Sequence, residues 1–442
     1  MTHPLTPRLI QRLERLTLPE LTAPVRYGRL QRVTGLTLEV VGLQASLGAR
    51  CLVAHGDAPV EAEVVGFDKG VLYLMPVVGT VGLTPGARVW QRQDQARYPA
   101  GQALLGRVID ALGQPLDGGP PIVSHRTLTL HSEPINPLLR KPIERPLDVG
   151  VRAINGLLTL GQGQRVGLIA GTGVGKSVLM GMMARFTTAD VVVVGLIGER
   201  GREVNDFIRH NLGEAGLQKS VVVAAPADAP PLMRLQGAQL ASAIAEDFRD
   251  QGLNVLLLMD SLTRFAQAQR EIALAVGEPP ASKGYPPSVF TRIPQLVERA
   301  GNGEEGTGTL TAIYTVLAEG DDTNDPIVDA ARGVLDGHIV LSRHLAEAGH
   351  YPAINIEQSV SRVMVDIVSQ AHMRQARRFR QLYSAYEQNR DFITLGVYRK
   401  GSNPLVDEAI ARHDRMMAYL AQGMYEAVCF ADSLRQLNEV LQ

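Results

Sequence analysis

The stretch "RVGLIAGTGVGKSVLM", residues 165–180, constrains the fold of this chain more than any other. An apolar run typical of a buried strand ends at Ala170, three glycines alternate with other residues, and a lysine and a serine then begin a helical pattern. Such glycines let consecutive backbone N–H groups point inward, and the start of a helix adds the positive end of its dipole. The sequence therefore predicts a phosphate-binding loop between a strand and a helix.

The motif for such a loop begins with glycine, whereas this chain has Ala170. We expect its methyl group to be tolerated as long as Ala170 keeps a negative φ. Lys176 is predicted to reach the β- and γ-phosphates of ATP, and the Ser177 hydroxyl to bind Mg²⁺. The residues predicted to contact the nucleotide here are Gly171, Thr172, Gly173, Val174, Gly175, Lys176, Ser177 and Val178.

Two further apolar runs lead into a carboxylate. The run "NVLLLMD" ends in Asp260, and "VVVVGLIGE" ends in Glu199. Because the carboxyl ends of parallel strands meet at one edge of a sheet, both side chains can face the bound phosphates. We predict that Asp260 binds Mg²⁺ and that Glu199 polarises the attacking water. The alternative for each is a solvated carboxylate at a strand end.

The hydrophobic pattern predicts an α/β protein. Over residues 25–92, apolar and polar residues alternate in short runs broken by turns, as in a small β-barrel. Between residues 165 and 356, strand runs alternate with helical runs, which indicates a mostly parallel sheet covered by helices. Beyond Arg362, residues 367–391 and 404–441 read as helices. The predicted domains are a β-barrel at 25–92, a phosphate-loop domain at 93–365 and a helical domain at 366–442.

The N-terminus has an amphipathic pattern. Leucines recur at helical spacing over residues 5–17, with Arg8, Arg12 and Arg15 beside them. A helix folded onto its own domain and a docking helix for a partner or a membrane surface both fit this pattern. We assign residues 1–24 to an N-terminal partner-docking helix.

Composition excludes several classes of protein. A formal net charge of -1 gives no general attraction to nucleic acid or to an anionic membrane. The two cysteines, Cys51 and Cys429, lie far apart, which argues against a disulfide framework or a zinc site and fits a reducing compartment. No apolar run reaches the ~20 residues that span a bilayer, and no secretory signal is evident. We therefore expect a cytoplasmic protein.

Several segments together resemble the rotary-ATPase α/β superfamily: "AGTGVGKS", "GERGREVNDFI", "LLLMDSLTRFAQAQREIALAVGEPPASKGYPPSVF" and "GHYPAINIEQSVSR". Within that superfamily the chain is most similar to the flagellar branch of the type III export ATPases. The likeness runs from "LGRVIDALGQPLDG" through the C-terminal helices. It implies a RecA-like core and Mg²⁺-dependent ATP hydrolysis by a homohexameric ring that energises or assists the export of flagellar proteins.

The resemblance also implies roles for single residues. Glu199 is similar to the catalytic carboxylate of the GER motif, and Arg200 to its neighbour that contacts the γ-phosphate. Arg362, which closes "SVSR", resembles the arginine that enters the neighbouring subunit's site, with a surface ion pair as the alternative. Tyr351 resembles the aromatic residue that stacks on adenine, with a place in the core as the alternative. Arg264 corresponds to a site arginine of less certain role.

The partners implied by the resemblance are proteins. They are a stator-like regulator bound through the N-terminal helix, a central stalk protein, the export gate, and export substrates with their chaperones. The implied location is peripheral to the inner membrane at the export apparatus, and no nucleic acid is expected.

Three other functions are weighed against this one. A virulence injectisome ATPase is the main alternative. A Rho-like RNA-dependent ATPase is suggested by the arginines and tyrosines of "MRQARRFRQLYSAY", residues 373–386, but the neutral charge and the barrel's lack of an aromatic-rich basic stripe argue against it. A non-catalytic ring subunit is argued against by Glu199, because such subunits replace that residue.

Overall fold

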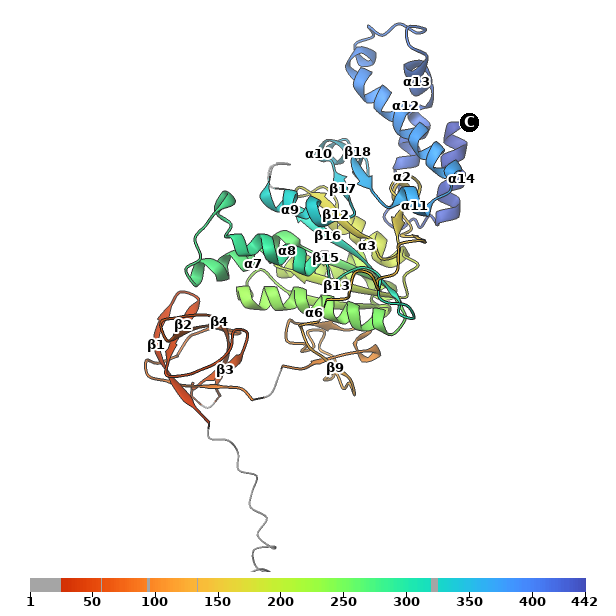
Figure 1. Cartoon of the computed structure of the whole chain (residues 1–442). Helices are drawn as coiled ribbons and strands as arrows, with labels where there is room; N and C mark the ends of the chain where they lie inside the picture. Colours follow the sequence, from red (N-terminus) through yellow and green to blue (C-terminus); the bar gives the residue numbers. More distant parts are fainter. Residues whose placement is uncertain (1–24, 57, 94–95, 133, 319–324) are drawn as a thin grey trace, which may run out of the picture. The chain divides into compact units, whose positions relative to one another are not determined.

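Residues 27–91 fold into a closed barrel (Figure 1). The apolar residues that alternate along its strands are buried together in one core. All neighbouring strands are antiparallel, in the order β1–β2–β5–β4–β3–β6. Lys69 and Gly70, with φ values of 47° and 82°, make the tight turn between β4 and β5. The strands are β1 Tyr27–Thr34, β2 Thr37–Val41, β3 Arg50–Val53, β4 Val60–Asp68, β5 Val71–Pro76 and β6 Arg88–Gln91.

The computed structural model describes residues 25–56, 58–93, 96–132, 134–318 and 325–442. Contacts divide the chain into two compact units, one up to residue 94 and one from residue 95 onward. The predicted docking helix of residues 1–24 lies outside the described residues. The predicted limits of the three domains stay predictions.

The second unit is built on an eight-stranded sheet in the order β18–β17–β12–β16–β15–β13–β14–β8. All neighbours are parallel except β17 and β18, which are antiparallel. The central strands are continuous apolar runs because helices and loops cover both faces. The strands are β8 Val108–Ile109, β12 Arg165–Ala170, β13 Val191–Ile197, β14 Ser220–Ala225, β15 Asn254–Asp260, β16 Thr309–Leu317, β17 Gly337–Leu341 and β18 Ile354–Ser361.

Helices connect these strands. Helices α6 and α7 pack on one face of the sheet against β13, β15 and β16, and α8 packs on α7 (Figure 1). Helix α3 packs against η2, a turn of π-helix. The helices are α2 Arg152–Leu157, α3 Lys176–Phe186, α4 Gly201–Asp206, η2 Phe207–Leu212, α5 Gly213–Gln218, α6 Pro231–Asp250, α7 Leu262–Ala275, α8 Pro287–Val297, α9 Pro326–Val334, α10 Arg343–Glu347 and α11 Met364–Ile367.

Short elements complete the second unit. Two 3₁₀ turns and two small ribbons, β7–β9 and β10–β11, join the larger pieces. They are η1 Gln102–Leu104, η3 Ser282–Gly284, β7 Tyr98–Pro99, β9 Thr127–Leu128, β10 Pro146–Leu147 and β11 Leu160–Gly161.

The C-terminal part is helical, and its apolar residues belong to the same core as α2, α3 and the sheet. It consists of α12 Gln370–Thr394, α13 Pro404–Leu420 and α14 Phe430–Leu441. The sequence pattern predicted one helix over 404–441, and this is wrong, because residues 421–429 form a loop. The Gln422 side chain explains the break: it donates to the carbonyls of Gly150 and Glu426 and accepts from the N–H of Arg152, so tertiary bonds replace helical ones.

Tyr314 on β16 gives a test of this core. Its side chain is fully buried, and its hydroxyl has no hydrogen-bond partner among the described residues. Because an unsatisfied buried hydroxyl costs about 1–3 kcal/mol, Tyr314→Phe should raise the free energy of unfolding by roughly 1 kcal/mol in urea denaturation.

Tyr419→Phe is the matched control. The Tyr419 hydroxyl donates to the carbonyl of Ser433 at 3.1 Å, so its removal should lower the free energy of unfolding by about 1 kcal/mol. Equal destabilisation by the two variants would contradict the packing described for Tyr314.

Candidate active site

The phosphate-binding turn lies between β12 and α3, at the carboxyl edge of the parallel sheet. Gly173 and Gly175 have φ values of 79° and 88°, which residues with a Cβ rarely adopt, so the turn needs glycine at both positions. Gly175 precedes α3 without a side-chain cap, which leaves the first N–H groups of the helix available to an anion. Ala170 keeps a negative φ, the condition under which its methyl group is tolerated.

The other residues of the turn differ in how deeply they are buried. Val174 is buried in the core of the second unit and anchors the turn there, whereas Thr172 and Gly173 are exposed. Ser177 and Val178 lie in the first turn of α3 and are half-buried. Thr172 and Gly173 therefore form the part of the turn that is open to a phosphate group.

Lys176 joins the turn to both predicted carboxylates. Its Nζ lies 2.5 Å from Oδ1 of Asp260 and 3.2 Å from Oε1 of Glu199. Asp260 is the last residue of β15, and Glu199 follows β13 by two residues. Burial lowers the pKa of Lys176, but Asp260 and Glu199 raise it by more, so the net shift is upward and the ammonium stays charged.

Glu199 has the electrostatics of a general base. Burial and the neighbouring charge of Asp260 raise its pKa to about 7, against the opposing effect of Lys176. A carboxylate with a pKa near the working pH is both ionised and basic enough to take a proton from water. Its backbone carbonyl accepts from the N–H of Ala227, which fixes the segment that carries it.

Two further residues lie next to the carboxylates. Thr315 was not predicted as a site residue, and the role of Arg264 was left uncertain. Thr315 on β16 donates to Oδ1 of Asp260 at 2.6 Å, and because β16 holds three threonines, its sequence does not single out Thr315. Arg264, at the start of α7, packs against Gly198, the residue before Glu199. A Cβ on Gly198 would lie 2.7 Å from the Arg264 Cβ. Gly198 also has a φ of 70°, so this close approach needs glycine.

Tyr351 lies beside the phosphate-binding turn. Two carbons of its ring are 3.4 Å from the point where a Cβ on Gly175 would be, and its side chain is 45% exposed. Its backbone carbonyl accepts from the N–H of Gln422 at 2.9 Å, which brings the loop of residues 421–429 to the same place. An exposed ring next to a phosphate site is suited to stacking on a base, and it is not a core residue.

The two remaining predicted arginines lie outside the cluster. Arg200 is exposed and pairs with Glu203 at 3.7 Å. Arg362 is also exposed, and its guanidinium donates to the carbonyls of Leu335 and Arg332 at 3.3 and 3.4 Å. The structure therefore brings Lys176 together with the two carboxylates but leaves both arginines facing outward.

Arg362 lies at the opposite edge of the sheet from Lys176. Its N–H donates to the carbonyl of Asp336, whose own N–H donates to the carbonyl of Arg165 at the amino end of β12. The turn with Lys176 follows the carboxyl end of β12, and six residues of strand span on the order of 17 Å. Within one chain, Arg362 therefore cannot reach the Lys176 cluster.

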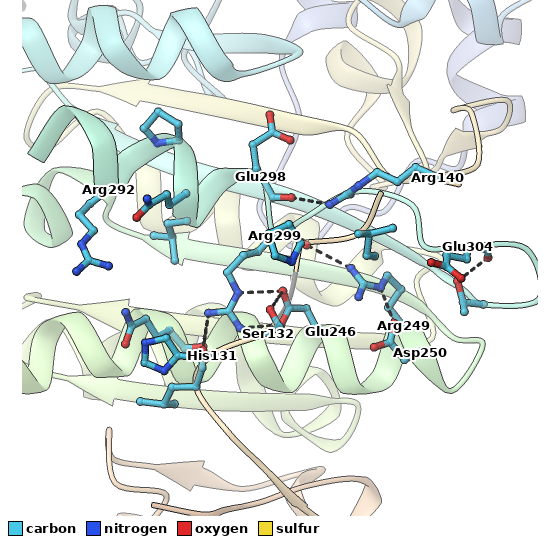
Figure 2. A pocket seen from close by; sticks show the side chains of 18 of the residues that line it. His131, Ser132, Arg140, Glu246, Arg249, Asp250, Arg292, Glu298, Arg299 and Glu304 are labelled. Atoms are coloured by element: carbon cyan, nitrogen blue, oxygen red, sulfur yellow. Dashed lines mark hydrogen bonds and ion pairs between the residues drawn. The ribbon is translucent and has the colours of Figure 1, made fainter. Parts of the chain in front are cut away.

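A cavity of about 850 Å³ lies apart from this cluster, between α6, α8 and the segment around Leu130 (Figure 2). Ion pairs occupy its walls: Arg299 makes a two-pronged pair with Glu246, at 2.9 and 2.6 Å. None of the predicted site residues lines it. Its lining contains no glycine-rich turn at a helix start, and its arginines Arg249 and Arg299 are engaged with Asp250 and Glu246, so the candidate site stays at the phosphate-binding turn.

Comparison with known proteins places the chain among ATPases. Residues 150–361 match the ATP synthase alpha/beta family, nucleotide-binding domain, and residues 368–439 match the T3SS EscN ATPase C-terminal domain. The flagellum-specific ATP synthase of Pseudomonas aeruginosa is 60% identical over 432 residues, covering 97% of this chain and 95% of the relative. The type 3 secretion system ATPase of Xanthomonas euvesicatoria is 47% identical over 437 residues, covering 98% of each chain.

Solved structures agree with these relatives. The assembled ATPase EscN of the enteropathogenic Escherichia coli type III secretion system has a TM-score of 0.89 and 42% identity, covering 94% of this chain and 100% of that chain. A structure of assembled EscN in complex with its central stalk EscO has a TM-score of 0.86 and 41% identity, with the same coverage.

The barrel, the phosphate-loop sheet and the C-terminal helices define a RecA-like P-loop ATPase. At 60% identity over nearly its whole length to a curated relative, the chain belongs to the flagellum-specific ATP synthase family. The predicted family, fold class and ATPase activity are thus confirmed. Within the described residues, no helix combines the length and the apolar character needed to cross a membrane.

Substitutions at Lys176 and Glu199 should separate nucleotide binding from hydrolysis. Lys176→Ala should abolish ATP turnover, because it removes the mobile cation at the β- and γ-phosphates. Glu199→Gln should keep ATP affinity but lower turnover by about 10²–10⁴-fold, since only the basicity of the side chain is lost. Phosphate release and calorimetric ATP binding measure the two effects.

Glu214→Gln, an exposed carboxylate on α5, is the matched control and should behave as wild type. Wild-type turnover in Lys176→Ala would end the assignment of the phosphate-binding turn. If affinity and turnover fell together in Glu199→Gln, Glu199 would be structural.

ATP hydrolysis should also depend on pH through Glu199. Glu199 must be ionised to accept a proton, and its raised pKa of about 7 means that the ionised fraction falls as the pH drops through 7. The value of kcat/KM for ATP should therefore decrease about tenfold per pH unit below 7. The pH dependence of ATP binding to Glu199→Gln supplies the correction for ionisation of ATP itself. A corrected profile that stays flat down to pH 5.5 would rule out this role.

Proposed function

We propose that this ATPase hydrolyses ATP with Mg²⁺ as a homohexameric ring and thereby energises or assists the export of flagellar proteins through a type III secretion apparatus. The convergence of Lys176, Glu199 and Asp260 behind the phosphate-binding turn carries the proposal. A mobile cation, a base with a raised pKa and a second carboxylate are the groups that in-line attack on a γ-phosphate requires.

Each group has a separate task. Lys176 exchanges its carboxylate partners for the β- and γ-phosphates, which frees Glu199 to hold and polarise the attacking water. Arg264, whose stem packs beside Gly198, keeps that segment in place. Arg200 contacts the γ-phosphate by exchanging its pair with Glu203, and this exchange costs little because an exposed ion pair is worth at most about 1 kcal/mol.

The same site suits Mg²⁺ and adenine. Mg²⁺ prefers oxygen ligands and usually takes one or two carboxylates together with substrate phosphates, which fits the hydroxyl of Ser177 and the carboxylate of Asp260, the partner of Lys176. When bound, the ion neutralises charge that develops on the transferred phosphoryl group. Tyr351, beside Gly175, stacks on the adenine ring.

The position of Arg362 supports a ring of identical chains. It cannot serve the site of its own chain, yet an exposed arginine at the far sheet edge can enter the site of the next chain in a head-to-tail ring. Every chain carries Lys176, Glu199, Asp260 and Arg362, so every interface of such a ring is a complete catalytic site. The assembled EscN is similar in fold, which supports an assembly of this kind.

A flagellar role is favoured over an injectisome role. The flagellum-specific relative from Pseudomonas aeruginosa is 60% identical, whereas the type 3 secretion system ATPase from Xanthomonas euvesicatoria is 47% identical over a similar length. The partners we propose are a stator-like regulator at the N-terminal segment, a central stalk protein as in the EscN complex, the export gate, and substrates with their chaperones. The proposed location is the cytoplasmic face of the inner membrane.

An RNA-dependent motor is disfavoured by the packing of the arginine-rich helix α12. Tyr383 is buried, and Tyr386 stacks on His413 with ring centroids 3.7 Å apart. Arg378 pairs with Glu408, and Arg380 donates to backbone carbonyls inside the fold. These side chains support helix packing and do not form an open stacking platform.

The prediction for the ring uses two inactive variants. Neither Glu199→Gln nor Arg362→Ala should hydrolyse ATP alone. When they are mixed, some interfaces pair an intact Glu199 with an intact Arg362 from the neighbour, so activity should reappear. Its size should depend on the mixing ratio and on the total protein concentration.

Two batches of the same variant, mixed in the same way, must stay inactive. Silence of the mixed variants while rings form, judged by light scattering, would show that Arg362 does not act between subunits.

A further inference from the structure

Arg185, in the last turn of α3, is a cation without an acidic partner among the described residues. Its guanidinium donates from Nη1 to the carbonyl of Asn211 and from Nη2 to the carbonyl of Met424. The rings of Phe186 and Tyr425 lie 5.1 and 5.5 Å from the guanidinium carbon. Two carbonyls and two aromatic faces thus take the place of a carboxylate.

This arrangement lowers the free energy of unfolding. The Nε of Arg185 is buried and has no hydrogen-bond partner among the described residues. Burial also lowers the pKa of the guanidinium. Arg185 is half-buried, so its charge is only partly removed from water, and an apolar side chain of similar length would leave the carbonyls of Asn211 and Met424 without these donors. We therefore look for the task of the cation in these two contacts.

The two carbonyls belong to segments far apart in the chain. Asn211 lies in the last turn of η2, where helical carbonyls lack partners within the helix. Met424 lies in the loop of residues 421–429 that separates α13 from α14. A planar guanidinium with two fixed donors holds both segments at once, which the single flexible ammonium of a lysine does poorly.

One of these two contacts is secured by other means. Gly181, one turn before Arg185, lets α3 approach η2 so closely that a Cβ there would lie 2.5 Å from the Asn211 carbonyl oxygen. The packing of α3 on η2 therefore does not depend on Arg185. Removing Arg185 should loosen mainly Met424 and the part of the loop around it.

That loop adjoins the side of the site where the base is proposed to bind. Gln422 donates its N–H to the carbonyl of Tyr351, whose ring lies against Gly175 of the phosphate-binding turn. Gln422 ties the start of the loop to Gly150 and Arg152, and Arg185 ties it two residues later. The loop next to Tyr351 is thus held at several points, because Arg152 and Asn155 also donate to it, and the Arg185 contact ties it to the phosphate-binding helix itself.

We infer that Arg185 is a positioning residue that clamps the loop of residues 421–429 onto α3 and so sets the affinity of the site for the base of ATP. The inference rests on the proposed function, in which Tyr351 stacks on adenine. It predicts that Arg185 affects binding of the base but not of the phosphates, which the backbone of the turn and Lys176 hold.

The test compares ATP with inorganic tripolyphosphate, which has the phosphates but no base. Calorimetric binding with Mg²⁺ is measured for the full-length wild type, Arg185→Met and Arg185→Lys. Arg185→Met should raise the Kd for ATP by up to about tenfold, the limit set by the loss of one charge-assisted hydrogen bond that orders the loop, and leave the Kd for tripolyphosphate unchanged. KM for ATP should rise with kcat nearly constant, and Arg185→Lys should be intermediate.

Arg378→Met removes an arginine from an ion pair with Glu408 on α13 and serves as the control, with no effect on either ligand. If the wild type binds ATP no better than tripolyphosphate, the base site fails and the role of Arg185 fails with it. If the wild type prefers ATP and Arg185→Met keeps that preference, or weakens both ligands equally, only the role of Arg185 is overturned. If Arg185→Met does not fold, the binding of ATP and tripolyphosphate to Arg185→Lys decides between these outcomes.

Discussion

The ion pairs of Lys176 with Asp260 and Glu199 are the interaction on which the site depends. The two carboxylates come from neighbouring strands, and without a shared cation they would repel each other in a poorly solvated place. One ammonium between two carboxylates leaves a net negative charge. This charge suits the binding of the Mg²⁺ ion that accompanies ATP. When Lys176 turns to the phosphates, Glu199 is left free as the base, and Asp260 would hold Mg²⁺, which would supply the positive charge that Lys176 gave up.

Sheet order then decides which groups can act together in one chain. Strands β12, β15 and β13 end at the same edge, so the lysine and the two carboxylates meet there without help from a partner. The antiparallel strand β18 runs back and delivers Arg362 to the opposite edge. A fold that separates these groups within one chain can reunite them only across an interface, and this is the physical basis for the proposed ring.

Sequence patterns predicted much of this structure, because many of its elements depend on the properties of residues that are neighbours in the chain. The strand before the turn, helix α3 and the carboxylates after apolar strands follow from glycine geometry and from continuous burial of parallel strands. Strand β17 and the antiparallel β18 were not predicted as strands, since their sequences carry no clear period. The loop after α13 was missed because Gln422 bonds to residues near Gly150, a contact 272 residues away that no local pattern reports. Thr315 was missed because its partner Asp260 lies on another strand.

The most direct test of the account is a structure of the assembled protein with ADP, Mg²⁺ and a fluoride mimic of the γ-phosphate. The account predicts that Lys176 leaves its carboxylates for the phosphates, that Glu199 faces the water in line with the mimic, and that Arg362 from the neighbouring chain points at the mimic. A bound nucleotide with Lys176 still paired to both Asp260 and Glu199, or with no arginine from a neighbour in the site, would contradict it.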